Sequence, residues 1–325
     1  MSVVLRVREL STSFPGPGGR VCVVDGVSLE LAEGEILALV GESGCGKSVT
    51  ALSILRLVPK PGRIDAGEIE IDGQDVLALS VSAMRRLRGG DAAMIFQEPM
   101  TSLNPVQTVG SQVVEAIRLH DSVSQSLARR RTVELFEQVR IPDATDRFEA
   151  YPHQLSGGLK QRVMIAMALA LRPKLLIADE PSTALDVTIQ AQILELMRDL
   201  QRDLGTAILL ITHDLGVVNE LADRIAVMYA GRIVEEGARK EVLSGARHPY
   251  TRGLMRSIPS LARRGEPLAE ISGVVPSPSE WPAGCRFSTR CDVVFERCRA
   301  EVPGPTRLSN THSTRCHVVE REESA

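Results

Sequence analysis

Residues 41–48 have the spacing of a loop that binds a chain of phosphates. They read Gly-Glu-Ser-Gly-Cys-Gly-Lys-Ser: a glycine, four residues, then glycine, lysine and serine. Glycines let the backbone wrap closely around phosphates and aim its amides at them, at a helix N-terminus that favours anions. Lys47 is expected to reach the β- and γ-phosphates, and the Ser48 hydroxyl to bind Mg²⁺. An apolar stretch before the loop, 36–40, and one after it, 48–57, supply the strand and the helix that this motif requires.

Two neighbouring acids end a second apolar stretch, residues 175–180. An acid at the C-terminal edge of such a strand can hold Mg²⁺ through water, and Asp179 fits that role. Glu180 would then polarise the attacking water as a general base. His213 follows another strand end, which in a parallel sheet lies at the same ligand crevice, and it is expected to sense the γ-phosphate.

The elements that must position these groups follow from periodicity. Strands are expected at 4–10, 27–31 and 35–40, with an edge strand at 67–72 and a helical insertion at 109–139. From residue 155 onward helices and strands alternate, as in a parallel α/β sheet. The expected elements are helix 158–171, strand 174–178, helix 187–202, strand 207–212 and helix 215–222, and a turn at 230–232 joins two further strands.

Composition narrows the class of protein. The chain has 325 residues, 43% hydrophobic and 24% charged, which excludes a disordered or fibrous protein. A formal net charge of -3 gives no basic field, so no nucleic-acid partner is expected. No apolar run approaches the roughly 18 residues that span a bilayer. Residues 1–10 alternate like a strand and lack the features of a signal peptide, so the cytosol is the expected compartment.

A further motif, Leu-Ser-Gly-Gly-Leu-Lys-Gln-Arg at residues 155–162, resembles the signature of ATP-binding cassette (ABC) ATPases. Ser156 and the two glycines after it would cap an apolar helix and leave amides available to a phosphate. In the family this element contacts the γ-phosphate held by an opposite subunit. Gln97 resembles the Q-loop glutamine, and residues 182–186 resemble the D-loop. Leu159 departs slightly from the commoner residue at its position.

This resemblance implies the fold, the cofactors and the site. The expected fold is α/β: a P-loop NTPase with a RecA-like core, an N-terminal antiparallel β subdomain and a helical subdomain at about 100–170. The ABC ATPase domain would span 1–255. The resemblance implies that the catalytic residues are Glu180, His213 and Gln97. It also implies that Mg²⁺ is bound by Ser48, Gln97 and Asp179. The residues implied to contact ATP are Phe14 (stacking on adenine), Gly41, Glu42, Ser43, Gly44, Cys45, Gly46, Lys47, Ser48, Val49, Ser156, Gly157, Gly158 and Asp186.

Narrower resemblances point to the ATPases of oligopeptide, dipeptide and nickel permeases. They are carried by residues 98–105 and 248–251, and residues 164–168 indicate the D-type member of the ATPase pair. The implied partners are a second, non-identical ATPase, two transmembrane subunits and an extracytoplasmic solute-binding protein. The chain would lie at the cytoplasmic face of the membrane and power import of peptides; nickel and glutathione stay open as cargoes. A soluble ABC ATPase is disfavoured, because the chain has one cassette and no sustained heptads.

Four of the six cysteines, Cys285, Cys291, Cys298 and Cys316, fall in a second region at 256–325 that is rich in proline, serine and arginine. Their spacings of five, six and seventeen residues do not suit structural zinc, in which gaps of two to four are usual. Four thiolates can also hold an iron-sulfur cluster, and the peptide-permease ATPases are similar in carrying four C-terminal cysteines associated with a 4Fe-4S cluster. Zinc and unligated thiols remain the alternatives.

Overall fold

The computed structural model describes residues 2–16, 18–97, 102–182, 185–257 and 271–323. The chain divides into two compact units. Unit 1 comprises Met1–Leu5, Leu31–Glu35 and Glu70–Leu209, and unit 2 comprises Arg6–Glu30, Ile36–Ile69 and Leu210–Ala325. Residues 98–101 and 183–184, which belong to two of the motifs above, lie outside the described residues.

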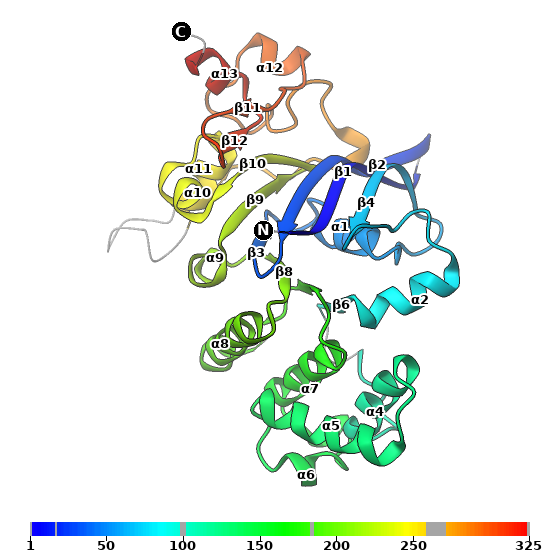
Figure 1. The fold of residues 1–325 in the computed structure, drawn as a ribbon. Coiled ribbons are helices and arrows are strands. Elements are labelled where there is room, and N and C mark those ends of the chain that lie inside the picture. Colours follow the sequence, from blue (N-terminus) through cyan, green and yellow to red (C-terminus); the bar gives the residue numbers. More distant parts are fainter. Residues whose placement is uncertain (1, 17, 98–101, 183–184, 258–270, 324–325) are drawn as a thin grey trace. The chain divides into compact units, whose positions relative to one another are not determined.

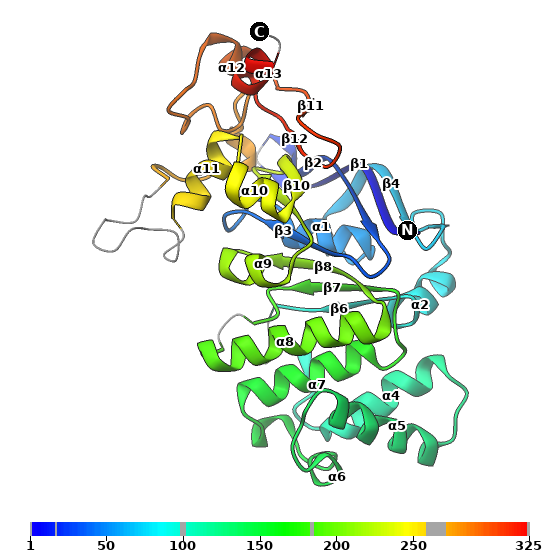
Figure 2. The same ribbon diagram turned by 60° about the vertical axis from the view of Figure 1, so that its left-hand side comes forward.

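Two buried strands of unit 1 run parallel to each other: β6 (Ala92–Ile95) and β7 (Leu175–Asp179). Both are continuous apolar runs, as expected for strands covered on both faces. Helices α7 (Gly157–Leu169) and α8 (Val187–Leu204) lie together on one side of this pair (Figure 2). The register aligns Ile95 with Ala178, so the carboxyl ends of both strands lie at one edge.

The predicted helical subdomain is present in unit 1, where α4 (Val109–His120), α5 (Gln125–Gln138) and α7 contact one another (Figure 1). Its apolar stripes are buried, with Val113, Ile117 and Phe136 all fully inaccessible. Local capping begins the helices, since Thr108 and Ser124 each accept a hydrogen bond from the backbone amide three residues later. The further helices of the unit are α2 (Val81–Gly90), α6 (Ala144–Arg147) and the 3-10 helix η1 (Pro152–Gln154).

Unit 2 has a mixed sheet built around β3 (Ile36–Val40), which pairs in parallel with β9 (Arg224–Tyr229). A tight turn at Gly231 leads antiparallel into β10 (Arg232–Ala238), as predicted. The sheet continues into the C-terminal region through β12 (Ser313–Thr314) and β11 (Thr306–Arg307). Strand β8 (Ala207–Thr212) has residues in both units.

An antiparallel sheet has the order β2-β1-β4-β5. Its members are β1 (Val3–Gly16), β2 (Gly19–Ala32), β4 (Arg63–Ile71) and β5 (Gln74–Asp75). The prediction of an edge strand at 67–72 was wrong in one respect: β4 lies between β1 and the two-residue β5, because a tight turn folds the chain back on itself. Strand β2 is also much longer than the predicted 27–31: it begins at the exposed Gly19 and continues through the half-buried Val21, Cys22 and Val23.

Helices cover the sheet of unit 2 and share a core with the C-terminal region. Tyr229, Tyr250 and Phe287 bury their rings against one another, with centroids 4.6–5.5 Å apart. The C-terminal region therefore packs on the same core as β3 and β9. The helices of this unit are α1 (Lys47–Ile54), α9 (Leu215–Leu221), α10 (Arg239–Gly245), α11 (Pro249–Arg256), η2 (Pro278–Glu280), α12 (Glu296–Ala300) and α13 (His317–Glu323). No helix in the described part of the chain is long and apolar enough to span a membrane.

Candidate active site

The predicted phosphate loop joins β3 to α1 in unit 2, and its glycines are required by close packing. A Cβ on Gly41 would lie 2.2 Å from the Met228 carbonyl oxygen. Gly46 precedes α1 with a φ of +109°, and its Cβ would lie 3.0 Å from the Val23 carbonyl oxygen. Any side chain at either position would push the loop off the sheet.

Lys47 is enclosed by the loop that carries it. Its side chain is only 6% exposed, and its ammonium donates to the carbonyl oxygens of Gly41 at 2.8 Å and Glu42 at 3.0 Å. Ser43 and Gly44, at the tip, are exposed to solvent. The loop therefore presents backbone, a fixed cation and the start of a helix at one place, which is the arrangement that binds phosphate.

Burial raises the pKa of the Cys45 thiol, so the side chain stays a neutral packing group in the loop. Its carbonyl oxygen accepts a hydrogen bond from Gly231 at 2.8 Å, which ties the loop to the turn between β9 and β10.

In unit 1, two predicted site residues meet at the carboxyl edge of β6 and β7. Gln97 follows β6 and Glu180 follows β7, and the Gln97 Nε2 donates to the Glu180 Oε2 at 3.1 Å. Asp179, the last residue of β7, is 4% exposed. Glu180 has a φ of +49°, a left-handed conformation that costs a non-glycine residue about 1–3 kcal/mol and is concentrated at functional sites. The parallel register explains this meeting, because it brings the ends of two distant strands together.

The signature residues begin α7, as predicted. The Ser156 hydroxyl accepts from the Leu159 amide at 3.4 Å, and its side chain is exposed. Arg162, on the same helix, is buried and donates to the Val139 carbonyl oxygen at 2.7 Å, which anchors α7 to α5. Asp186 caps α8 in the same way, accepting from Ile189 at 3.0 Å.

The structure says less about the roles of two other predicted site residues, His213 and Phe14. His213 is exposed, directly after β8. Phe14 is half-buried near the end of β1, and its ring leaves so little room that a Cβ on Gly62 would lie 2.4 Å from it. Its stacking on adenine stays a prediction.

The four C-terminal cysteines lie in unit 2 as free thiols, and each is half-buried or buried. Cys285 donates its backbone amide to the Cys298 carbonyl oxygen at 2.8 Å. Burial raises the pKa of Cys285 and of Cys291 to about 11, and the charges of the other cysteines add to the rise. Among the described residues, no three side chains of the cysteine, histidine or acidic type stand in a metal-binding arrangement.

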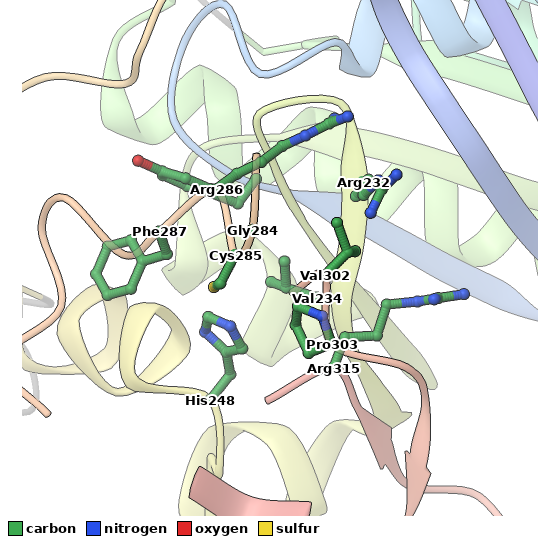
Figure 3. Close-up of a pocket in the computed structure, with 11 residues that line it drawn as sticks. Arg232, Val234, His248, Gly284, Cys285, Arg286, Phe287, Val302, Pro303 and Arg315 are labelled. Carbon is green, nitrogen blue, oxygen red and sulfur yellow. The ribbon is translucent and has the colours of Figure 1, made fainter. Parts of the chain in front are cut away.

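Cys285 also lines a cavity of about 20 Å³, beside His248 and Phe287 (Figure 3). That volume has room for about one water molecule, so the cavity is no ligand pocket.

Sequence reasoning missed two residues that contact the phosphate loop. Tyr250 accepts a hydrogen bond from the Glu42 amide at 2.9 Å, and Arg290 pairs with the Glu42 carboxylate at 2.9 Å. Tyr250 lies in the 248–251 motif, which was a signal for a family but not for a contact. Nothing near Arg290 in the chain indicates that it reaches a loop 248 residues away.

The fold and these groups together define an ATP-binding cassette ATPase. A family model described as ABC transporter matches residues 24–183, and a model described as oligopeptide/dipeptide transporter, C-terminal region, matches residues 234–298. Among solved structures, a dimeric post-hydrolysis state of the ATP-binding cassette MJ0796 bound to ADP and Pi is similar, with a TM-score of 0.65 and 26% identity over 72% of this chain and 98% of that chain. The cbiO1 protein of Clostridium perfringens gives a TM-score of 0.64 and 27% identity, over 75% of this chain and 92% of its own.

Relatives of nearly equal length identify the subfamily within the ATP-binding cassette ATPases. The dipeptide transport ATP-binding protein DppD of Escherichia coli K12 is 49% identical over 97% of this chain and 96% of its own length. A putative peptide import ATP-binding protein of Brucella ovis is 51% identical over 96% of each chain. This chain belongs to the ATP-binding subunits of the oligopeptide/dipeptide ABC transporter family, and it is an ATPase.

Proposed function

We propose that this chain powers the import of dipeptides or oligopeptides by binding and hydrolysing ATP. The names and high identity of the relatives support the cargo class. The observation that supports ATP binding and hydrolysis is the geometry of the phosphate loop, in which the Lys47 ammonium donates to the carbonyl oxygens of Gly41 and Glu42. A transport assay with labelled dipeptide, nickel and glutathione distinguishes the three cargoes: uptake of nickel or glutathione alone would contradict the proposal.

Each site residue takes the role that the family assigns to it. Ser48, Asp179 and Gln97 hold Mg²⁺, Glu180 activates water, and His213 senses the γ-phosphate. The exposed N-terminus of α7 reaches the nucleotide of a second subunit. Phe14 and Val49 complete the contacts with ATP, together with Gly41, Glu42, Ser43, Gly44, Cys45, Gly46, Lys47, Ser48, Ser156, Gly157, Gly158 and Asp186.

The partners follow from this assignment. A second, non-identical ATPase completes the dimer, and both lie on the cytoplasmic face of the membrane beneath two transmembrane subunits. A solute-binding protein outside the cytoplasm delivers the cargo. The ATPase domain extends to about residue 255, and the C-terminal region follows it.

Glu180→Gln tests the role of the base in the reconstituted transporter. Glutamine keeps the shape of the side chain and its partner Gln97 but cannot accept a proton, so ATP should still bind while turnover falls by about 100-fold or more. Glu220→Gln, an exposed acid on α9, is the matched control and should retain full turnover. Wild-type turnover in Glu180→Gln would show that another group is the base.

The C-terminal cysteines hold a 4Fe-4S cluster in this proposal. Four thiols in one region of the chain supply donors of the right type and number for such a cluster. Such a cluster would act as a staple for the C-terminal region.

Anaerobic purification with iron and sulfide analysis tests the cluster. About four irons per chain with a visible charge-transfer band support it. Zinc alone, or protein with no metal, would contradict it. Cys298→Ser should abolish the band, whereas Cys22→Ser, at a half-buried thiol on β2, should leave it unchanged.

A further inference from the structure

Arg290, in the cysteine-rich C-terminal region, is buried against the phosphate loop. Its side chain is 5% exposed, and its NH1 donates to both carboxylate oxygens of Glu42, at 2.9 and 3.2 Å. The same nitrogen lies 3.4 Å from the Tyr229 hydroxyl. The rest of the guanidinium is fixed by carbonyl oxygens, with Nε donating to Ser272 at 2.9 Å and NH2 to Ile271 at 3.1 Å. Nearly every donor of the side chain therefore has a defined acceptor.

Glu42 is held at three points, and all three lead to the nucleotide site. Its carboxylate binds Arg290, its backbone amide donates to the Tyr250 hydroxyl at 2.9 Å, and its carbonyl oxygen accepts from the Lys47 ammonium at 3.0 Å. A shift of Glu42 would move the carbonyl group that orients Lys47. The position of the lysine that binds phosphate thus depends on the segment that holds the Glu42 side chain.

Charge gives Arg290 a second effect on the same loop. A carboxylate within a loop that receives a triphosphate repels the ligand unless a cation neutralises it. The Arg290 guanidinium lies 2.9 Å from the Glu42 carboxylate, close enough to offset this repulsion.

We propose that Arg290 is a positioning residue for ATP hydrolysis, which holds Glu42 and thereby sets the phosphate loop in its ATP-binding conformation. Arg290 directly precedes Cys291, so the cysteine-rich region supports the nucleotide site through one side chain. This role is separate from the identity of the cargo and from the metal content of the cysteines.

The test measures KM for ATP and kcat in the reconstituted transporter for Arg290→Ala, Arg290→Lys, Glu42→Gln and the double variant. Loss of a charge-assisted hydrogen bond should raise KM about tenfold in Arg290→Ala, with kcat within about twofold. Arg290→Lys keeps the charge but cannot span the same acceptors, so an intermediate rise of about threefold is expected. In the Glu42→Gln background, Arg290→Ala should raise KM for ATP about threefold or less, because no carboxylate is then left without a cation beside it.

Arg299→Ala is the matched control, because Arg299 is exposed in the same region. An Arg290→Ala effect on KM no larger than that of the control would overturn the proposal. So would equal effects of Arg290→Ala in the wild-type and Glu42→Gln backgrounds, or a loss of activity that appears only in kcat and follows the fraction of unfolded protein. If Arg290→Ala does not fold, Arg290→Lys decides: a raised KM at unchanged kcat supports the role, and a wild-type KM refutes it.

Discussion

Glu235 is a buried acid that joins β10 to the C-terminal region, and its removal should unfold that region selectively. The residue is 1% exposed. Its carboxylate accepts from the backbone amides of Arg247 at 2.7 Å and His248 at 2.9 Å, and it pairs with the His312 Nε2 at 2.8 Å. Burial acts to raise the pKa of Glu235, but these hydrogen bonds outweigh it and lower the pKa, so the side chain is ionised.

The cost of Glu235→Ala follows from the groups left behind. A buried backbone amide, a partly buried one and a histidine ring lose their acceptor, at about 1–3 kcal/mol each. Some of this is recovered by water entering the space, so we expect a net loss of about 3–5 kcal/mol, the range measured when one partner of a buried ionic group is removed.

The chain contains one tryptophan, Trp281, which makes the assay specific to the C-terminal region. The Arg286 guanidinium lies 3.5 Å above its ring, so indole fluorescence should change when this region opens. With a urea slope of about 2 kcal/mol/M, a loss of 4 kcal/mol lowers the midpoint by about 2 M.

Glu322→Ala is the matched control for Glu235→Ala, because Glu322 is a half-exposed acid that pairs with the Arg247 side chain at 3.0 Å. A surface pair of this kind contributes about 1 kcal/mol or less. Equal midpoints in the two variants would refute this, because burial would then add nothing to the contribution of Glu235.

Two further predictions concern pH and packing. Burial lowers the pKa of His248 from 6.5 to about 4, so the unfolded chain takes up a proton first as pH falls. Unit 2 should therefore lose up to about 3 kcal/mol of stability between pH 6.5 and 4. An unchanged urea midpoint at pH 7.5 and 4.5 would contradict this. Gly110→Ala in α4 should destabilise the helical subdomain by about 1–3 kcal/mol despite the better helix propensity of alanine, because its Cβ would lie 2.3 Å from the Phe148 ring. Faster amide hydrogen exchange in α4 checks the second prediction, and slower exchange would show that propensity outweighs the clash.

Local features of the site were predictable because each depends on residues that are adjacent in the sequence. The phosphate loop lies between a strand and a helix as expected, and Ser156 caps α7 as expected, although the helix begins at Gly157, one residue before the predicted start. Helix caps and glycine positions depend on the backbone of their own segment, so sequence reasoning reaches them directly. The meeting of Gln97 with Glu180 needed one further step, the parallel order of two strands.

Sequence by itself determined the kind of protein, the phosphate loop and the acids that follow β7. Only the tertiary structure decided what holds the loop in place: Tyr250 and Arg290 reach Glu42 from the opposite end of the chain. It also decided that β4 is not an edge strand and that the C-terminal region shares the core of β3 and β9. Such contacts depend on which surfaces meet after the chain has folded. No periodicity, helix cap or motif in the sequence predicts which distant residues will be in contact.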